Sequence, residues 1–237
     1  MRNNFASIQI VFTLGMYFLG ACFFAAAILP TSFLFFHFWN SFQPQSDLQK
    51  GALIAGGIGL GYFIFGLTLT VETVLFRLIF RLKLKEGEYS LGSLETFKWA
   101  FVNSLILIVK YTFMNFMKVT PFLPLYYRWM GAKVGKRVQI NTTDIGDVSL
   151  LEICDDAVIG GEVVLIGHLA EHGKLKLKRT KIGQKVTIGL GSVIMPGCEI
   201  GDGSLIAARS VLLKNTVVPP NSIFAGSPAK WIRNVTE

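Results

Sequence analysis

The pattern of hydrophobic and polar positions changes character partway along the 237-residue chain. Long apolar runs fill the first part, and a short regular period begins at Val134. No Asp, Glu, Lys or Arg occurs from Phe5 to Ser46, and the stretch from about Ile8 to Leu29 is long enough to cross a bilayer as a helix. The pattern therefore predicts a first membrane span.

A cleaved signal peptide is an alternative interpretation of this first run. Arg2 supplies a basic start, and the alanines at 25–27 resemble a small-residue cleavage site. The apolar pattern nevertheless continues past the alanines through Phe33–Trp39, which favours a retained helix.

A second uncharged run lies between Lys50 and Glu72. It is rich in glycine, and small residues let two helices approach closely inside a membrane. Because only a short segment separates the two runs, we predict a hairpin of two membrane helices.

The formal net charge of +8 is concentrated in one part of the chain. The whole excess falls in residues 77–137, where eleven Lys or Arg residues face only Glu86, Glu88 and Glu95. This basic band follows the second apolar run, so the positive-inside rule places both chain ends in the cytoplasm. The band also favours membrane lipids over a nucleic acid as partner. We expect a multi-pass protein of the bacterial inner membrane with a cytoplasmic C-terminal domain.

A third apolar stretch covers about Phe97–Met117 and is interrupted by Lys110. Lys98 and Lys118 flank it, which favours a helix lying in the membrane interface. A third span is the alternative, and it would move the C-terminal domain to the other side of the membrane. The aromatic and basic residues at 126–129 that follow suit the headgroup level of a bilayer.

From Val134 onward, an aliphatic residue recurs every sixth position, usually followed by a small residue, with a small or β-branched residue four places on. The period indicates a coil with three short sides and about eighteen residues per turn, whose aliphatic residues stack inside. We predict an all-β parallel β-helix, and we expect Cys198, at the fifth position of its six-residue unit, to be a small core residue. The uninterrupted block opens its units with Ile182, Ile188, Ile194, Ile200, Ile206, Leu212, Val218 and Phe224.

These patterns divide the chain into three predicted parts. Residues 1–96 form the membrane hairpin and its basic flank, residues 97–130 the interfacial helix and a Pro-containing connector, and residues 131–237 the β-helix. The period is interrupted at residues 166–181, which we interpret as an excursion loop, and loops of this kind commonly carry function. The loop begins with Gly167 and His168. It also holds five cations, which fit either contact with anionic headgroups or attraction of an anionic donor.

With these features in hand, residues 131–234 resemble the hexapeptide-repeat acyltransferases. Three features carry the resemblance in order: Gly167-His168 at the start of the loop, the uninterrupted coils, and the closing run Ala225–Arg233. The resemblance implies a left-handed β-helix, a homotrimer and active sites between subunits. With its membrane helices, the chain is also similar to the C-terminal membrane modules of bacterial polylysine synthetase-like proteins, which implies acyl or aminoacyl transfer at a membrane surface.

The implied reaction is attack of an acceptor hydroxyl or amine on the thioester of acetyl-coenzyme A or of a carrier-bound acyl group. The acceptor would be a small molecule or lipid-linked. Such attack needs a base that works near neutral pH, and His168 is the candidate. Glu171 could orient its imidazole or help to deprotonate an amine, and the alternative is a solvated loop carboxylate.

A second set of residues would hold the cofactor. The resemblance suggests that the first four line a slot for the pantetheine arm and that the two lysines meet the phosphates of coenzyme A. The alternatives are corner geometry for the small residues and surface solvation for the lysines. The set is Gly189, Gly191, Ala207, Ala208, Lys214 and Lys230.

Two other functions remain open at this point. A γ-class carbonic anhydrase shares the fold but needs three zinc-binding histidines, and the repeat domain holds only His168 and His172, so we expect no metal. A trimeric membrane scaffold that uses the coil only for assembly is the non-enzymatic alternative, because the fold by itself does not imply catalysis.

Overall fold

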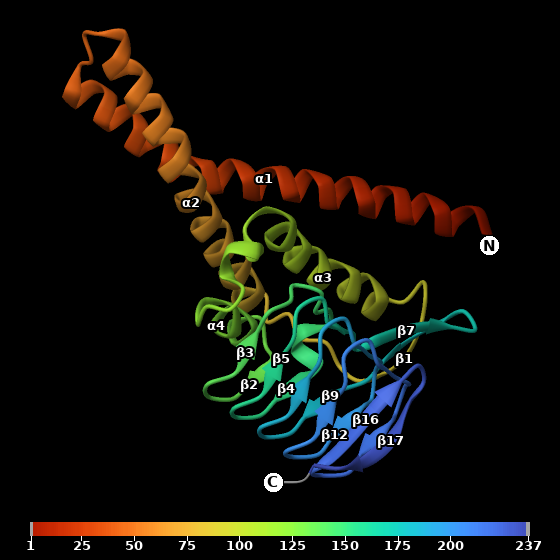
Figure 1. The fold of residues 1–237 in the computed structure, drawn as a ribbon. Helices are drawn as coiled ribbons and strands as arrows, with labels where there is room; N and C mark the ends of the chain where they lie inside the picture. Colours follow the sequence, from red (N-terminus) through yellow and green to blue (C-terminus); the bar gives the residue numbers. More distant parts are fainter. Residues whose placement is uncertain (1, 236–237) are drawn as a thin grey trace. The chain divides into compact units, whose positions relative to one another are not determined.

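The computed structural model describes residues 2–235, which form two compact units. The first unit is built from the chain up to Phe80 together with Leu107–Phe113, and the second from Arg81–Ile106 and the chain after Met114. This division differs from the predicted boundaries at residues 96 and 130. The basic flank joins the β-helix because its strand β1 (Gly87–Ser90) pairs with the excursion, as Figure 1 shows.

The first unit contains the two long helices α1 (Arg2–Phe42) and α2 (Asp47–Ile79). Ser46 caps α2, since its side chain accepts a hydrogen bond from the Gln49 amide while the Gln49 side chain accepts one from the Ser46 amide. Helix α1 runs on past the predicted end at Leu29 and includes Pro30. Both helices are long and apolar enough to cross a membrane, and no third helix in residues 2–235 passes that test.

Glycines of α2 lie where another side chain leaves no room for a Cβ atom. A Cβ at Gly57 would lie 2.6 Å from Cδ2 of Phe35, and one at Gly61 would lie 2.5 Å from Cγ2 of Thr31. The Thr31 hydroxyl also donates to the Gly61 carbonyl at 3.1 Å. The predicted close packing of the two helices is therefore confirmed.

Replacing Gly61 with leucine should destabilise this helix pair by about 1–3 kcal/mol, because the new side chain overpacks the contact with Thr31. Gly59→Leu is the matched control, since nothing lies within 4 Å of a Cβ at that position of the same helix. Unfolding of the detergent-purified protein by sodium dodecyl sulfate measures the difference. Equal midpoints for the two variants would contradict the close packing.

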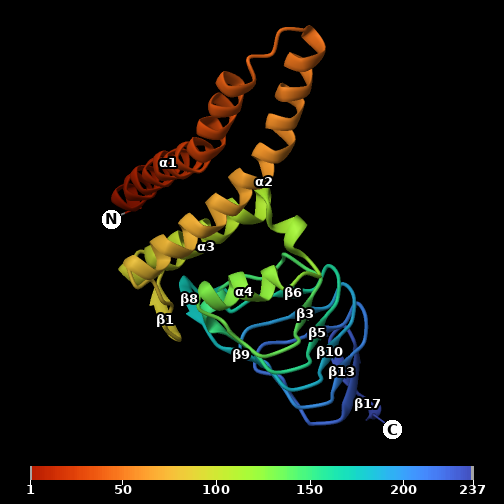
Figure 2. The same cartoon turned by 90° about the vertical axis from the view of Figure 1, so that its left-hand side faces the viewer.

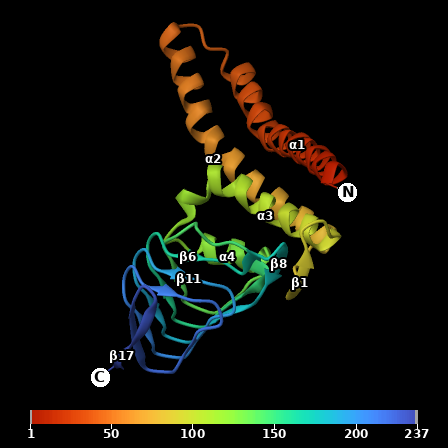
Figure 3. The same cartoon turned by 90° about the vertical axis from the view of Figure 1, so that its right-hand side faces the viewer.

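The second unit contains a parallel β-helix, whose coils Figure 2 shows stacked in sequence order. Ile188 pairs with Ile206, and Ile200 with Val218, so register partners are eighteen residues apart, as predicted. Figure 3 shows the side of the coil that carries β6 and β11. One face of the coil is formed by β2 (Lys133–Val134), β4 (Leu151–Ile153), β9 (Thr180–Ile182), β12 (Glu199–Ile200) and β15 (Val217–Val218). A second face is formed by β6 (Val164–Leu165), β11 (Val193–Ile194) and β14 (Val211–Leu212). The remaining face is formed by β3 (Gln139–Ile140), β5 (Val158–Ile159), β10 (Thr187–Ile188), β13 (Leu205–Ile206), β16 (Ser222–Gly226) and the antiparallel β17 (Ala229–Asn234).

The interior of the coil follows the predicted period. Ile188 and Ile206 are fully buried, and so is Cys198, which confirms that this thiol is a core residue. Buried serines occupy the fifth position of several six-residue units, and their hydroxyls form hydrogen bonds with the backbone. Ser204, for example, donates to the Pro219 carbonyl at 2.7 Å. The glycine at the corner after β10 is required by space, because a Cβ at Gly189 would lie 2.5 Å from the amide nitrogen of Ala208.

Helices cover part of the coil. Helix α3 (Leu94–Thr112) is followed by the short helix η1 (Met114–Met117) and by α4 (Phe122–Trp129), which packs on β2 and β3 of the first coil. The headgroup-level interpretation of residues 126–129 is wrong for the two tyrosines, because Tyr126 and Tyr127 are 1% exposed. Arg128 donates instead to the carbonyls of Val134 and Gly135.

The predicted excursion loop is an ordered sheet. Strands β7 (His168–Glu171) and β8 (Lys174–Leu177) form an antiparallel hairpin, and β1 pairs with the other edge of β8. Leu175 and Leu177 are buried in a cluster with Leu84, Val102 of α3 and Leu150 of the short helix η2 (Val148–Leu150). The first half of α3 therefore packs with one face against the core of this unit, and its interfacial location stays a prediction.

Candidate active site

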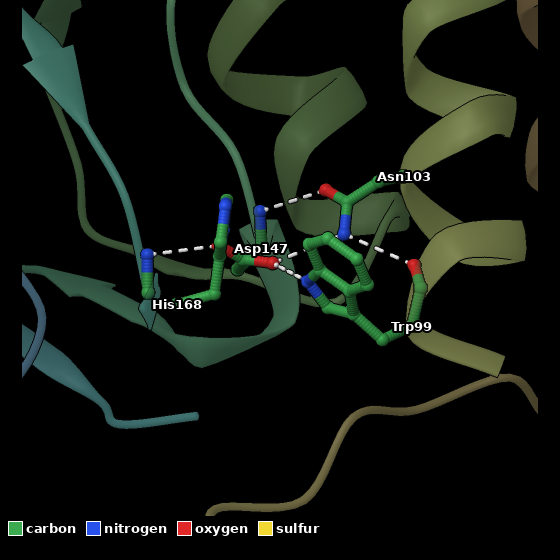
Figure 4. Close-up of polar contacts among 5 residues, drawn as sticks. Trp99, Asn103, Asp147 and His168 are labelled. Carbon is green, nitrogen blue, oxygen red and sulfur yellow. Dashed lines mark hydrogen bonds and ion pairs between the residues drawn. The ribbon is translucent and has the colours of Figure 1, made fainter. Parts of the chain in front are cut away.

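His168 is the first residue of β7, at the point where the chain leaves the coil. Its Nδ1 lies 2.6 Å from Oδ2 of Asp147. Figure 4 shows the two side chains next to each other, with Trp99 and Asn103 on the other side of Asp147. The imidazole is 32% exposed, whereas the Asp147 side chain is completely buried. The two residues form an Asp–His pair that presents only the histidine to solvent.

Donors surround the Asp147 carboxylate on every side. Trp99 donates its indole N–H to Oδ1 at 2.6 Å, and Asn103 donates its amide to the same atom at 3.0 Å. The Gly167 backbone N–H donates to Oδ2 at 2.9 Å, and the Asn103 side-chain oxygen accepts from the Asp147 amide at 3.0 Å. Since Trp99 and Asn103 are one turn apart on α3, this helix holds the carboxylate in place.

These contacts decide the charge of the carboxylate. Burial acts to raise the pKa of Asp147, but the hydrogen bonds and charge of His168, with the Asn103 amide and the Gly167 N–H, outweigh it and hold the pKa below its usual range. Asp147 is therefore an anion at neutral pH. An anionic partner on Nδ1 favours the tautomer with its proton there, which leaves Nε2 free to accept a proton.

Local geometry explains why glycine precedes His168. A Cβ at Gly167 would lie 2.9 Å from Cβ of Asp147 and 3.2 Å from the Lys178 carbonyl. Asp147 itself has a positive φ of 51°, a conformation that Asp tolerates better than most residues. The indole of Trp99 meets the imidazole edge-on, with ring centroids 4.8 Å apart. Backbone, carboxylate and ring together fix the orientation of His168.

The hypothesis that Glu171 orients His168 is wrong, because the carboxylate that contacts Nδ1 of His168 belongs to Asp147. Glu171 lies three residues along the strand, hence on the opposite face. Its carboxylate accepts from Nζ of Lys214 at 2.6 and 2.8 Å, and Lys176 lies 3.5 Å away. The hydrogen bond from Lys214 holds the pKa of Glu171 below its usual range. Lys214, predicted to meet a phosphate, is thus engaged within the chain.

Four of the remaining predicted cofactor residues lie together at one corner of the coil, and the fifth, Lys230, lies elsewhere. Gly189 and Gly191 follow β10, and Ala207 and Ala208 follow β13 one coil further on. The φ of Gly191 is +66°, so its corner role is real. Lys230 lies on β17 and is exposed. A cofactor role for this corner stays a prediction.

The cations of the excursion are largely neutralised. Arg179 pairs with Glu86 at 3.2 Å, and both Lys174 and Lys176 lie within 4 Å of Glu88. Two of the three acidic residues in the basic band, Glu86 and Glu88, therefore neutralise positive charges of the excursion. This pairing argues against a surface of unpaired cations there. Among the described residues, no group of three His, Cys, Asp or Glu side chains could hold a metal ion.

Sequence reasoning missed Asp147, Trp99 and Asn103. One signal was available for the first of them, because the repeat phase gains one extra residue between Ile140 and Ile153. That irregular segment contains Asp147 and the helix η2. Nothing in the sequence around Trp99 and Asn103 connects them with a residue more than forty positions away.

Part of the parallel β-helix matches a family of transferases. Residues 179–214 match the family model described as bacterial transferase hexapeptide (six repeats). The chain is similar to delta-poly-L-ornithine synthetase of Acinetobacter baumannii, with 27% identity over 51% of this chain and 9% of that protein. It is also similar to galactoside O-acetyltransferase of Escherichia coli, with 31% identity over 48% of this chain and 60% of that protein. The chain thus spans less than two thirds of either relative.

A solved maltose O-acetyltransferase of Clostridium difficile shares the fold. It has a TM-score of 0.50 and 23% identity, covering 65% of this chain and 95% of that chain. Other matching acetyltransferases, with TM-scores below 0.5, were crystallised with coenzyme A or acetyl-coenzyme A. The chain thus resembles hexapeptide-repeat acyltransferases, which confirms the resemblance inferred from the sequence.

Proposed function

We propose that this protein is a membrane-anchored acyltransferase that moves an acetyl group from coenzyme A to a hydroxyl or amine acceptor, with His168 as general base. The observation that carries the proposal is the 2.6 Å contact between Nδ1 of His168 and the buried carboxylate of Asp147. The acetyltransferases among its relatives support the reaction class. A carrier-bound thioester is the alternative donor.

In this reaction, Nε2 of His168 takes the proton of the acceptor as its oxygen or nitrogen attacks the thioester carbonyl. A tetrahedral intermediate forms, and its collapse breaks the bond between carbon and sulfur. The imidazolium then returns the proton to the departing thiolate of coenzyme A. Asp147 contributes a fixed negative charge that stabilises the imidazolium while it exists. Trp99 and Asn103 are positioning residues, because they act through Asp147.

The family resemblance supports a left-handed coil and a homotrimer. In a trimer, the exposed edge of His168 would open toward a neighbouring subunit, and the corner at Gly189, Gly191, Ala207 and Ala208 would form the wall for the pantetheine arm. Lys230 is free to meet a phosphate of the cofactor. Lys214 would first have to exchange its contact with Glu171.

Membrane anchoring rests on the two long apolar helices. The basic flank that follows α2 supports a cytoplasmic location for the coil, and the composition fits the bacterial inner membrane. This location would give the site access to cytosolic acetyl-coenzyme A and to membrane-delivered acceptors.

The proposal is tested with the detergent-purified protein, radiolabelled acetyl-coenzyme A and two acceptor pools, one a lipid extract and the other a set of soluble sugars and amines. We expect saturable binding of acetyl-coenzyme A in calorimetry, and release of free thiol that requires one of the pools. Binding without transfer to either pool would favour a non-catalytic scaffold. Absence of binding would exclude coenzyme A as donor.

A further inference from the structure

A small pocket of about 180 Å³ lies within the second unit, beside the excursion sheet. Three lysines, Lys83, Lys85 and Lys98, surround it, and Leu84 and Leu177 form its apolar wall. The remaining lining residues are Tyr89 and Glu95. Three of the lining residues are thus basic and one is acidic.

These lysines differ from the other cations near the excursion. Lys174, Lys176 and Arg179 each pair with a glutamate, whereas no ion pair or hydrogen bond joins the ammonium group of Lys83, Lys85 or Lys98 to another described residue. Like charges held around one concavity repel each other, and a bound anion would relieve that repulsion.

The backbone around the pocket is fixed. The Tyr89 hydroxyl donates to the carbonyls of Lys85 and Glu86 at 3.1 and 3.3 Å, which closes the segment into a compact turn. Leu84 is 4% exposed and its amide donates to the Ser149 hydroxyl. The lysines are therefore presented from a packed framework.

The pocket and the Asp–His pair are built on the same strand pair and the same helix. Leu177 is the register partner of His168 across the β7–β8 hairpin, so the two side chains share one face of the sheet. Lys98 immediately precedes Trp99, whose indole contacts both the imidazole and the Asp147 carboxylate. Leu177 and the first turns of α3 therefore connect the pocket with the candidate base.

We propose that this pocket binds a phosphoryl group of the acceptor substrate and so places the reacting hydroxyl or amine at His168. Lysine is a common phosphate ligand, and a phosphate monoester or diester offers several oxygens to three ammonium groups at once. The proposal deepens the transferase function and rests on it. The phosphoryl group could belong to a lipid headgroup or to a soluble phosphorylated acceptor, and both present the same chemistry.

The test measures binding by the full-length protein, and it needs no turnover. Glycerol 3-phosphate, with glycerol as its neutral control, probes the soluble source in detergent. Nanodiscs of phosphatidylglycerol, compared with phosphatidylcholine, probe the lipid source. The variants are Lys83→Gln and Lys98→Gln. The matched control is Lys136→Gln, an exposed lysine of the first coil with no ion pair to a described residue.

We expect saturable binding of at least one phosphorylated probe that weakens about tenfold in Lys83→Gln and Lys98→Gln, the loss expected for one charge-assisted hydrogen bond, and that Lys136→Gln leaves unchanged. Lysine-dependent binding of glycerol 3-phosphate would indicate a soluble acceptor, and binding restricted to phosphatidylglycerol a lipid-linked one. If all three variants weakened probe binding equally, or if no probe bound saturably, the assignment of phosphate binding to this pocket would be wrong.

The two proposals fail in different ways. His168→Ala should retain phosphate binding, because His168 does not line the pocket. If acetyl transfer occurs while phosphate binding is absent, the pocket assignment is wrong and the transferase stands. If lysine-dependent binding occurs and no acceptor is ever acetylated, the transferase is wrong.

Discussion

Replacing His168 with alanine is expected to lower the rate of acetyl transfer by about 10²–10⁴-fold, because the acceptor loses the group that takes its proton. The affinity for acetyl-coenzyme A should change little, since the imidazole acts on the acceptor. Turnover is measured as thiol release under saturating donor, and affinity by calorimetry.

His172→Ala is the matched control for this variant. His172 lies in the turn of the same hairpin, is exposed, and forms no hydrogen bond with Asp147 among the described contacts. It should keep wild-type turnover. If both variants retained full activity with an intact fold, the coil would serve assembly and the reaction would need another base or another protein.

The second large effect is expected for Asp147→Asn. The amide lacks the negative charge and brings two N–H donors into a site already filled by donors from Trp99, Asn103 and Gly167. It also favours the wrong tautomer of His168. We expect a loss of about 10³–10⁴-fold in turnover, by analogy with the same change in Ser-His-Asp enzymes.

Asp147→Asn should also change how stability depends on pH. The folded-state pKa of Asp147 is below its usual value, so the folded protein binds fewer protons than the unfolded chain in that range. Its contribution is present above an unfolded pKa of about 3.9 and is lost as the pH falls through the folded pKa. The stability difference between wild type and variant, measured by chemical denaturation of the purified protein, should therefore shrink below about pH 4. A difference that did not change with pH would contradict an anionic Asp147.

The coil could be predicted from the sequence because its stabilising contacts repeat. Each aliphatic opener stacks on the residue eighteen positions away, so the core of the β-helix is visible as a period. The excursion sheet has no such signature. The alternation of lysine and leucine in β8 fits a strand, but β1 pairs with it across more than eighty residues and has no hydrophobic pattern of its own.

Charge and composition showed where basic and aromatic residues cluster along the sequence, but they did not show which residues these clusters contact in the fold. Glu86 and Glu88 look like minor interruptions of a basic band in the sequence, and in the structure they neutralise the cations of the excursion. Tyr126 and Tyr127 have the composition of an interfacial cluster, yet the end of the first coil buries them. His168 was found because it stands at the break in the six-residue period. Asp147 was missed because its role depends on hydrogen bonds from residues that are distant in the sequence.

Strand β17, the last strand that the structure describes, covers one face at the end of the coil. Strand β17 runs antiparallel to β16 and carries Lys230 and Arg233 along an exposed edge. A parallel ladder that stopped at β16 would offer its unpaired amides and carbonyls to any further coil, including one from another molecule. Reversing the strand direction and charging the edge removes that template on the face that ends in β16, whereas the other two faces end in the parallel strands β14 and β15. The regular repeat is therefore closed on one face by a charged antiparallel edge that a further parallel coil could not continue.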